Sequence, residues 1–331
     1  MEKLKSKKLR LKTAVPAAVL TLAAVLALGG ARSAAAAEED AERTAAAVEA
    51  AERTAAAEEE ADRTAAVPEG LSYEVKFLLD PEQVLDEEHH LKKEWEQAFG
   101  VTEEFVPYEV MYLETPEQDF RQEGWFNRFR RKSGKKKVER TYKKRYSVTD
   151  GDIAAAYETA KKDGFRIPEK DAGKDAADGF EAQIDWGYDQ MTLSFSYENS
   201  EKTEGSDSLA SFSAEEARAF LKKGMPEKEA DWKQKGWGLL MTDRAEAVGP
   251  VRFLREKGTL ADREITVEIW PVMEAEKNEL HFTVELSFKA GDFPDARDGR
   301  TKLTELLDEK GILLHEDSLK TGMILDAGLS R

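Results

Sequence analysis

Eight segments of the chain alternate apolar and polar residues at the two-residue period of a half-buried β-strand. Several are joined by turn-length connections, such as SGKK at 133–136, which is typical of antiparallel meanders. The sequence therefore predicts a sheet whose strands span 72–79, 108–115, 125–132, 138–148, 180–188, 191–198, 263–272 and 280–289.

Helical patterns lie between these segments. Pro81 suits the first position of a helix, and Ser213 and Glu216 have the spacing of a capping box. Because helices and strands are interspersed, the predicted class is α+β. The predicted helices span 80–99, 149–162, 214–223 and 295–310.

Each predicted strand carries one apolar and one strongly polar face, because alternate side chains of a strand point to opposite sides. The polar faces are segregated by charge. Cations occupy the third and fourth strands, and carboxylates occupy the first, fifth, seventh and eighth. The charged residues on these faces are Glu74, Lys76, Arg128, Arg130, Lys143, Arg145, Glu181, Asp185, Glu268 and Glu285.

Two architectures produce this alternation. An open sheet with its polar face in water does so, and so does a closed barrel with a polar interior. The segregation of charge, and several Thr, Ser and Gln residues where a solvated face usually has Lys and Glu, favour the barrel. We therefore predict an eight-stranded antiparallel closed β-barrel, a tunnel with a polar lumen and helices packed outside.

The N-terminus resembles an export signal. A basic start, with six Lys or Arg up to Lys12, precedes an uncharged, mostly apolar run at 13–31, and small residues end at Ala37. We expect cleavage there, although an uncleaved signal could anchor the chain in a membrane. Residues 38–70 contain a ten-residue repeat, AERTAAA, which predicts a partly helical spacer ahead of one domain over 71–331.

Charge and cysteine content narrow the partners and the location. The formal net charge is −17, and residues 1–37 carry seven cations and one anion, so the mature chain would stand at −23. This balance argues against a nucleic-acid partner. With no cysteine, the chain has neither a disulfide nor a lipidated cysteine. We expect a secreted, extracellular or cell-wall-associated bacterial protein.

The segment WFNRFRRKSGKKKVERTYKKRYSV at 125–148 holds eleven Lys or Arg residues against one acidic residue, Glu139. Cations that converge in a small lumen repel one another unless an anion lies between them. Opposing carboxylates would repel that anion unless a divalent cation bridges the two. Phosphate oxygens with Asp or Glu are ligands that Mg²⁺ and Mn²⁺ prefer, so a polyphosphate–metal complex fits.

Five stretches resemble the CYTH superfamily, the triphosphate tunnel metalloenzymes. SYEVKFLLDP is similar to the first-strand ExExK signature, and VMYLETPEQDFRQEGWFNRFRRK is similar to the YxDTPxxxLxxxGxxLRxR region. VERTYKKRYSV resembles the strand of the tunnel lysine, and FEAQIDWG and FTVELSFK resemble two acidic strands. Ser72 stands where the first Glu of ExExK belongs, so one carboxylate is absent.

The resemblance implies an eight-stranded tunnel that holds a triphosphate with Mg²⁺ or Mn²⁺. It implies that the phosphates contact Lys76, Arg128, Arg130, Lys143 and Arg145, that Glu74, Glu268 and Glu285 hold the metal, and that Glu181 or Asp185 orients the attacking water. Three functions stay open at this point: a metal-dependent triphosphatase, an inactive extracellular module that binds polyphosphate or another anion, and a scaffold whose lumen charges pair with each other.

Overall fold

The computed structural model describes residues 67–168, 176–203, 208–274, 279–317 and 320–329. All of them belong to one unit, Arg63–Arg331. The signal at 1–37 and most of the spacer at 38–70 lie outside the described residues, so both stay predictions. Within the described part of the chain, no helix has the length and apolar character needed to cross a membrane.

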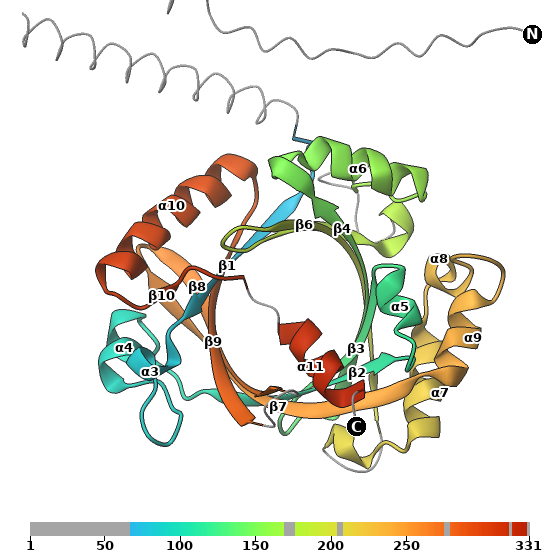
Figure 1. Ribbon diagram of the computed structural model, residues 1–331, viewed down its shortest axis with the longest axis horizontal. Helices are drawn as coiled ribbons and strands as arrows, with labels where there is room; N and C mark the ends of the chain where they lie inside the picture. The colour runs from blue at the N-terminus through green and yellow to red at the C-terminus, as the bar shows by residue number, and fades with distance from the viewer. Residues whose placement is uncertain (1–66, 169–175, 204–207, 275–278, 318–319, 330–331) are drawn as a thin grey trace, which may run out of the picture. The chain divides into compact units, whose positions relative to one another are not determined.

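Nine strands close into a ring, seen end-on in Figure 1. Around the ring the order is β1, β5, β6, β4, β3, β2, β7, β8 and β9, and β9 pairs back with β1. A two-residue strand, β10, pairs with the end of β1 outside this ring. The strands are β1 Ser72–Leu79, β2 Val106–Glu114, β3 Trp125–Lys132, β4 Lys137–Val148, β5 Glu181–Trp186, β6 Met191–Lys202, β7 Glu246–Leu260, β8 Arg263–Glu274, β9 Glu279–Ala290 and β10 Leu313–Leu314.

The closed barrel is confirmed, but the predicted strand number and pairing are wrong. The pattern analysis missed β7, which brings the ring to nine strands. A ring with an odd number of strands cannot alternate direction all the way round, so one neighbouring pair must be parallel. That pair is β1 and β5, which run side by side from Ser72 opposite Gln183 to Val75 opposite Trp186.

Most helices lie outside the ring, and α11 lies within it (Figure 1). The outer helices cover the apolar strand faces: Phe129 of β3 meets Phe220 of α7 edge to face at 5.0 Å, and Tyr73 of β1 meets Phe293 of α10. Burial of such a ring contributes roughly 1.5–3 kcal/mol. The helices are α3 Pro81–Val84, α4 Lys93–Ala98, α5 Asp119–Gln122, α6 Ile153–Lys162, α7 Ala214–Gly224, α8 Glu227–Ala230, α9 Trp237–Arg244, α10 Phe293–Glu309 and α11 Lys320–Leu329.

Two of the helix predictions have clear outcomes. The capping box of α7 is confirmed: the Ser213 hydroxyl accepts from the Glu216 amide, and the Glu216 carboxylate accepts from the Ser213 amide at 2.8 Å. The single helix over 80–99 is wrong. The backbone is extended at Leu85, which forms a β-bridge with Leu91, so α3 and α4 are separate short helices.

The lumen is partly apolar, in contrast to the polar lumen predicted from the sequence. Ile324 and Leu325 of α11 are buried in a cluster with inward-facing residues of β2, β7 and β8. This lumen cluster comprises Val110, Tyr112, Val248, Phe253, Trp270, Val272, Ile324 and Leu325. The C-terminal helix therefore fills one part of the tunnel and leaves the charged part beside it.

Glu229 of α8 is buried against the outer face of β3 and gives a pH prediction. Its Oε1 accepts from the Asn127 amide at 2.7 Å, its Oε2 has no hydrogen-bond partner, and burial raises the pKa to about 8. The folded state therefore binds this proton more tightly than the unfolded state. The stability that it contributes is complete below the unfolded pKa of about 4.5 and is lost as pH rises toward 8.

We expect Glu229→Gln to remove this loss, because the amide stays neutral at every pH. Each unit of pKa shift corresponds to about 1.4 kcal/mol, so the unfolding free energy of the variant should exceed that of the wild type by a margin that grows by a few kcal/mol between pH 5 and pH 8. Urea unfolding at several pH values measures it. Parallel pH profiles for the two proteins would contradict the assignment.

Candidate functional site

One buried carboxylate, Asp185 of β5, ties together the basic side of the lumen. It accepts from Lys76 of β1 at 3.0 Å, from Lys143 of β4 at 3.3 Å and from the Ser194 hydroxyl of β6 at 2.7 Å. Lys76 also contacts Glu74 at 3.1 Å. Strands that are distant in sequence thus place four charged side chains around one point.

Arg145 also acts on Asp185, and with it the group has three cations and two carboxylates. Burial alone would raise the pKa of Asp185, but Lys143, Lys76 and Arg145 hold it well below its usual range. Burial lowers the pKa of Lys143 to about 8, and repulsion from Arg145 and Lys76 adds to this despite the attraction of Asp185. The low pKa of Lys143 thus reflects its burial first and the neighbouring cations second.

Two guanidinium groups in the lumen have no carboxylate partner. Arg128 of β3 and Arg145 of β4 form neither an ion pair nor a side-chain hydrogen bond with the described residues, and the Nε of Arg128 is buried without a partner. Arg145 lies over the Phe126 ring at 4.3 Å. By contrast, Arg130 is paired with Glu139 at 2.7 Å.

The acidic side of the lumen lies on β8 and β9, where Glu268 and Glu285 are direct cross-strand neighbours. Lys320 of α11 contacts both carboxylates, at 3.0 Å and 2.9 Å. Arg255 of β7 adds a longer contact of 3.5 Å to Glu268, and Trp270 donates its indole N–H to Glu268 at 2.9 Å. Burial would raise the pKa of Glu268, but Lys320 and Arg255 lower it to about 2.

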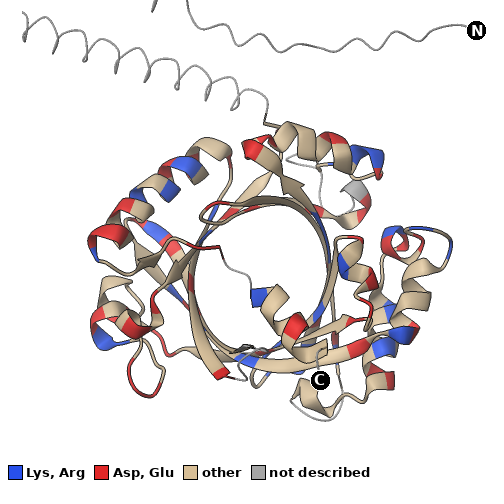
Figure 2. Cartoon of the chain, viewed as in Figure 1, with Lys and Arg blue, Asp and Glu red and all other residues tan. Residues whose placement is uncertain are grey.

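In Figure 2, basic and acidic residues are coloured along the strands of the ring, and α11 begins with a basic residue. The first residue of α11 is Lys320. A cavity of about 410 Å³ opens beside them. It is lined mainly by polar side chains of β1, β7, β8 and β9, among them Glu74, Arg255, Lys257, Thr266, Ser287 and Lys289. The lumen therefore has an accessible mouth whose lining contains both signs of charge.

The structure gathers most of the predicted site residues, though in two groups. Lys76, Lys143, Arg145 and Asp185 lie together, and Arg128 lies near enough to lower the Lys143 pKa. Glu181 is exposed and has no side-chain partner among the described residues. Of the predicted catalytic pair, only Asp185 lies within the basic group.

The residues present do not fit the predicted three-carboxylate metal site. Glu74 lies opposite Lys289, four residues along β9 from Glu285, or about 13 Å at strand spacing. Ser72, which replaces an expected carboxylate, donates to the Ala182 carbonyl at 3.2 Å. Among the described residues, no three His, Asp or Glu side chains gather in a way that could hold a metal. The function proposed for the lumen therefore does not require a metal.

Several lumen residues had no signal in the sequence analysis. Arg255 belongs to the strand that the pattern missed, and Lys320 is a single cation before a short apolar segment, TGMIL. Ser194 was placed on a polar strand face, but its hydrogen bond to Asp185 depends on how β5 and β6 are staggered. A strand pattern predicts which face of the sheet a residue lies on, but not its position along the barrel axis, which depends on the stagger between strands.

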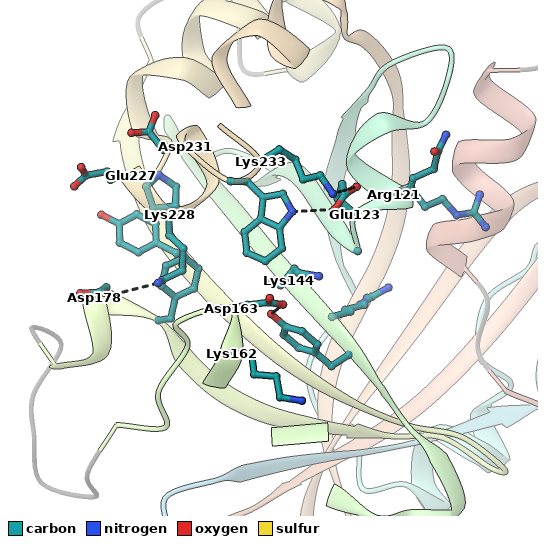
Figure 3. Close-up of a pocket in the computed structure, with 18 of the residues that line it drawn as sticks. Arg121, Glu123, Lys144, Lys162, Asp163, Asp178, Glu227, Lys228, Asp231 and Lys233 are labelled. Carbon is teal, nitrogen blue, oxygen red and sulfur yellow. Dashed lines mark hydrogen bonds and ion pairs between the residues drawn. The ribbon is translucent and has the colours of Figure 1, made fainter. Parts of the chain in front are cut away.

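A larger cavity of about 1320 Å³ lies outside the barrel, between the outer face of β4 and α8 (Figure 3). Several of its charged side chains already have partners. Lys233 pairs with Glu123 at 2.9 Å, and the Lys144 ammonium lies 4.4 Å from the Tyr146 ring and 4.9 Å from the Trp232 ring. The unpaired guanidinium groups lie in the lumen, so the lumen is the better candidate.

Among known proteins, only solved structures match this chain. No protein-family model matches the chain, and no curated protein matches it. Similar solved structures include HpAC1 from Hippeastrum, described as a putative adenylyl cyclase with a dominant triphosphatase activity. It is 13% identical, with a TM-score of 0.45 and coverage of 76% of this chain and 94% of that one.

Two further structures are described as putative adenylate cyclases. The one from Bacillus halodurans is 10% identical, covers 75% of this chain and 92% of its own, and has a TM-score of 0.37. The one from Vibrio parahaemolyticus is 11% identical, covers 78% and 100%, and has a TM-score of 0.35. Likeness at these scores assigns no activity to this chain. The closed barrel and its charged lumen, taken from this structure alone, are the architecture expected from the resemblance to the CYTH superfamily.

Proposed function

We propose that the lumen binds a triphosphate or polyphosphate chain and does so without a metal. The observation that carries the proposal is the pair of guanidinium groups, Arg128 and Arg145, that form no ion pair with a described carboxylate. Burial of cations without counter-charges is costly, and an anion in the lumen would remove that cost. A scaffold whose charges merely pair with one another would not leave these two groups without partners.

The arrangement of the cations favours an extended anion with several charged groups. Arg128 lies on β3, and Lys143 and Arg145 lie two residues apart on the neighbouring β4. Alternate residues of a strand are about 6.6 Å apart, so the three cations are spread along the lumen. Arginine forks suit pairs of phosphate oxygens, and lysine acts as a point charge. A chain of phosphates can reach all three groups.

Hydrolysis receives no support from the geometry. The low pKa of Asp185 makes its carboxylate a weak base, because Lys143 and Lys76 hold its charge. The Glu268–Glu285 pair is already in contact with two cations, Lys320 and Arg255. We therefore place this chain among anion-binding modules and not among phosphohydrolases. We further propose, from residues 1–37 alone, that it acts outside the cell.

Calorimetric titration of the full-length protein with tripolyphosphate in EDTA tests the proposal. We expect saturable binding that weakens with salt, and a thermal stabilisation that grows with ligand concentration, by about 2.7 kcal/mol at a hundredfold excess over the dissociation constant. We expect no release of orthophosphate in the same samples. If tripolyphosphate fails to bind both in EDTA and with Mn²⁺ present, the scaffold function is correct and this proposal is wrong.

A further inference from the structure

A single lysine from the C-terminal helix occupies the acidic part of the lumen. Glu268 and Glu285 face each other across neighbouring strands, and their side chains are only 12% and 6% exposed. Two carboxylates this close and this shielded from water repel each other strongly unless a cation lies between them. The cation that the structure provides is the ammonium of Lys320.

We propose that Lys320 is a tethered cation that takes the place of a divalent metal between Glu268 and Glu285 and so makes ligand binding in this lumen independent of metal. The proposal deepens the proposed function, since it specifies how the same lumen is neutralised. Its central part, the exclusion of metal by Lys320, stands without any phosphate ligand.

The contacts of Lys320 are those of a built site. The ammonium lies 3.0 Å from Oε2 of Glu268 and 2.9 Å from Oε1 of Glu285, and it lies over the Trp270 ring at 4.6 Å. The carboxylates of Glu268 and Glu285 raise the pKa of Lys320 against the opposing effect of burial. The charge is therefore kept in the lumen despite the loss of water.

The helix that carries Lys320 is fixed by packing along its length. Ile324 and Leu325 are buried in the lumen cluster. Near the other end, Gly328 lies so close to Val248 that an added Cβ would lie 2.1 Å from Cγ1 of that valine. Asp326 pairs with Arg121 of α5 at 2.5 Å. The position of the Lys320 ammonium thus depends on close packing of α11 against Val248, which only glycine at 328 allows.

One carboxylate oxygen of the Glu268–Glu285 pair is available to bind a metal ion if the Lys320 ammonium is removed. Oε2 of Glu285 is buried and has no hydrogen-bond partner. Two carboxylates, completed by water or phosphate oxygens, are a usual protein contribution to an Mg²⁺ or Mn²⁺ site. Without Lys320, Glu268 and Glu285 would form such a pair, and among the described residues Arg255 would be their one remaining ion-pair partner, at 3.5 Å from Glu268. Lys76 and Arg128 would act on them at longer range.

The test is a titration of the full-length protein with Mn²⁺ as the probe, followed by electron paramagnetic resonance and with no phosphate present. We expect Lys320→Met to bind one Mn²⁺ at least about tenfold more tightly than the wild type, because a charge at contact distance is removed. Lys320→Arg should behave as the wild type does. Lys302→Met, which removes an exposed lysine of α10, is the matched control and should change nothing.

Two further variants locate the site and guard against a folding failure. Adding Glu285→Gln to Lys320→Met should abolish the gained Mn²⁺ binding. Gly328→Leu should displace α11 from Val248 and give the same gain with Lys320 intact. The inference is overturned if folded Lys320→Met or Gly328→Leu gains no Mn²⁺ binding, or if the wild type already binds Mn²⁺ through Glu285 as tightly. Absence of tripolyphosphate binding in the wild type would instead reject only the proposed function.

Discussion

Replacement of both Arg128 and Arg145 by methionine is expected to raise the dissociation constant for tripolyphosphate roughly 10²- to 10⁴-fold. A hydrogen bond to a charged group contributes about 1.5–3 kcal/mol, and each 1.4 kcal/mol corresponds to a factor of ten in affinity. Each single variant should lose roughly tenfold to a hundredfold. Calorimetric titration in EDTA measures all three.

Arg145→Met should not destabilise the free protein, because burial lowers the pKa of Arg145 and repulsion from Arg128 adds to this. Methionine keeps much of the aliphatic length of arginine, and the substitution removes a cation that repels Lys143. The pKa of Lys143 should therefore rise in Arg145→Met, because one of the groups that lower it is gone. An unfolding midpoint equal to or above that of the wild type, together with lost affinity, distinguishes a ligand-binding role from a structural one.

Arg252 offers a matched control, because it is an exposed arginine on the outward side of β7, opposite Glu109. Arg252→Met removes the same charge from the outside of the barrel. We expect less than about a twofold change in tripolyphosphate affinity, apart from the weak effect of net charge. If Arg252→Met weakens binding as much as Arg128→Met does, the anion binds the outer surface and the lumen is not the site.

The sequence predicted the strand faces well because the two-residue period is a property of the backbone. Glu74 and Lys76 on β1, and Lys143 and Arg145 on β4, are inward-facing as expected, while Tyr73 and Phe129 are buried under the outer helices. This inference needs no knowledge of which strands are neighbours. It did not give the right division of the lumen, because β1 and β5, expected to be acidic, carry Glu74 and Asp185 into contact with Lys76 and Lys143.

The missed strand β7 shows where pattern reasoning fails. Gly249 and Pro250 interrupt the alternation, and charged residues at 252 and at 255–257 leave few apolar positions to mark a face. Without β7, an even ring of antiparallel strands was the natural expectation. The parallel pairing of β1 with β5 follows only once the ninth strand is counted.

The three carboxylates of the predicted metal site do not gather in the described residues, for a related reason. Glu74, Glu268 and Glu285 share the inner face, but their heights in the barrel depend on the stagger of β1, β8 and β9. The stagger places Glu74 opposite Lys289, four residues from Glu285, and leaves only the other two together. Lys320 contacts Glu268 and Glu285 from α11, and no local sequence pattern predicts that this helix lies in the lumen. The position of α11 depends on packing with residues more than two hundred positions away, such as Tyr112.

Asp185→Asn is expected to lower the unfolding free energy by about 2–4 kcal/mol, although it changes only one atom type. The carboxylate is 11% exposed and contacts Lys76 and Lys143, which are 21% and 14% exposed. Loss of one partner of a buried ion pair costs about 3–5 kcal/mol, and partial solvent access reduces this figure. The amide keeps an oxygen for the Ser194 hydroxyl, so lost packing contributes little.

The pH dependence of this difference identifies its cause. The pKa of Asp185 is lower in the folded protein than in the unfolded chain, so its contribution is complete above the unfolded value of about 3.8. It is lost as pH falls through the folded value. The gap between wild type and Asp185→Asn in urea unfolding should therefore be constant from pH 5 to pH 7 and narrow below pH 4. A gap that persists unchanged in acid would indicate a packing defect instead.

Tripolyphosphate should reverse the destabilisation, which links this carboxylate to the proposed ligand. Asp185 is an anion inside the binding site, so its removal should tighten tripolyphosphate binding and leave Lys143 free to contact the ligand. Saturating ligand should then stabilise Asp185→Asn more than the wild type. Glu181→Gln on the same strand is the control: Glu181 is exposed and has no side-chain partner among the described residues, so stability should change by less than about 0.5 kcal/mol. Equal stabilisation of Asp185→Asn and wild type by tripolyphosphate would show that the anion binds away from Asp185.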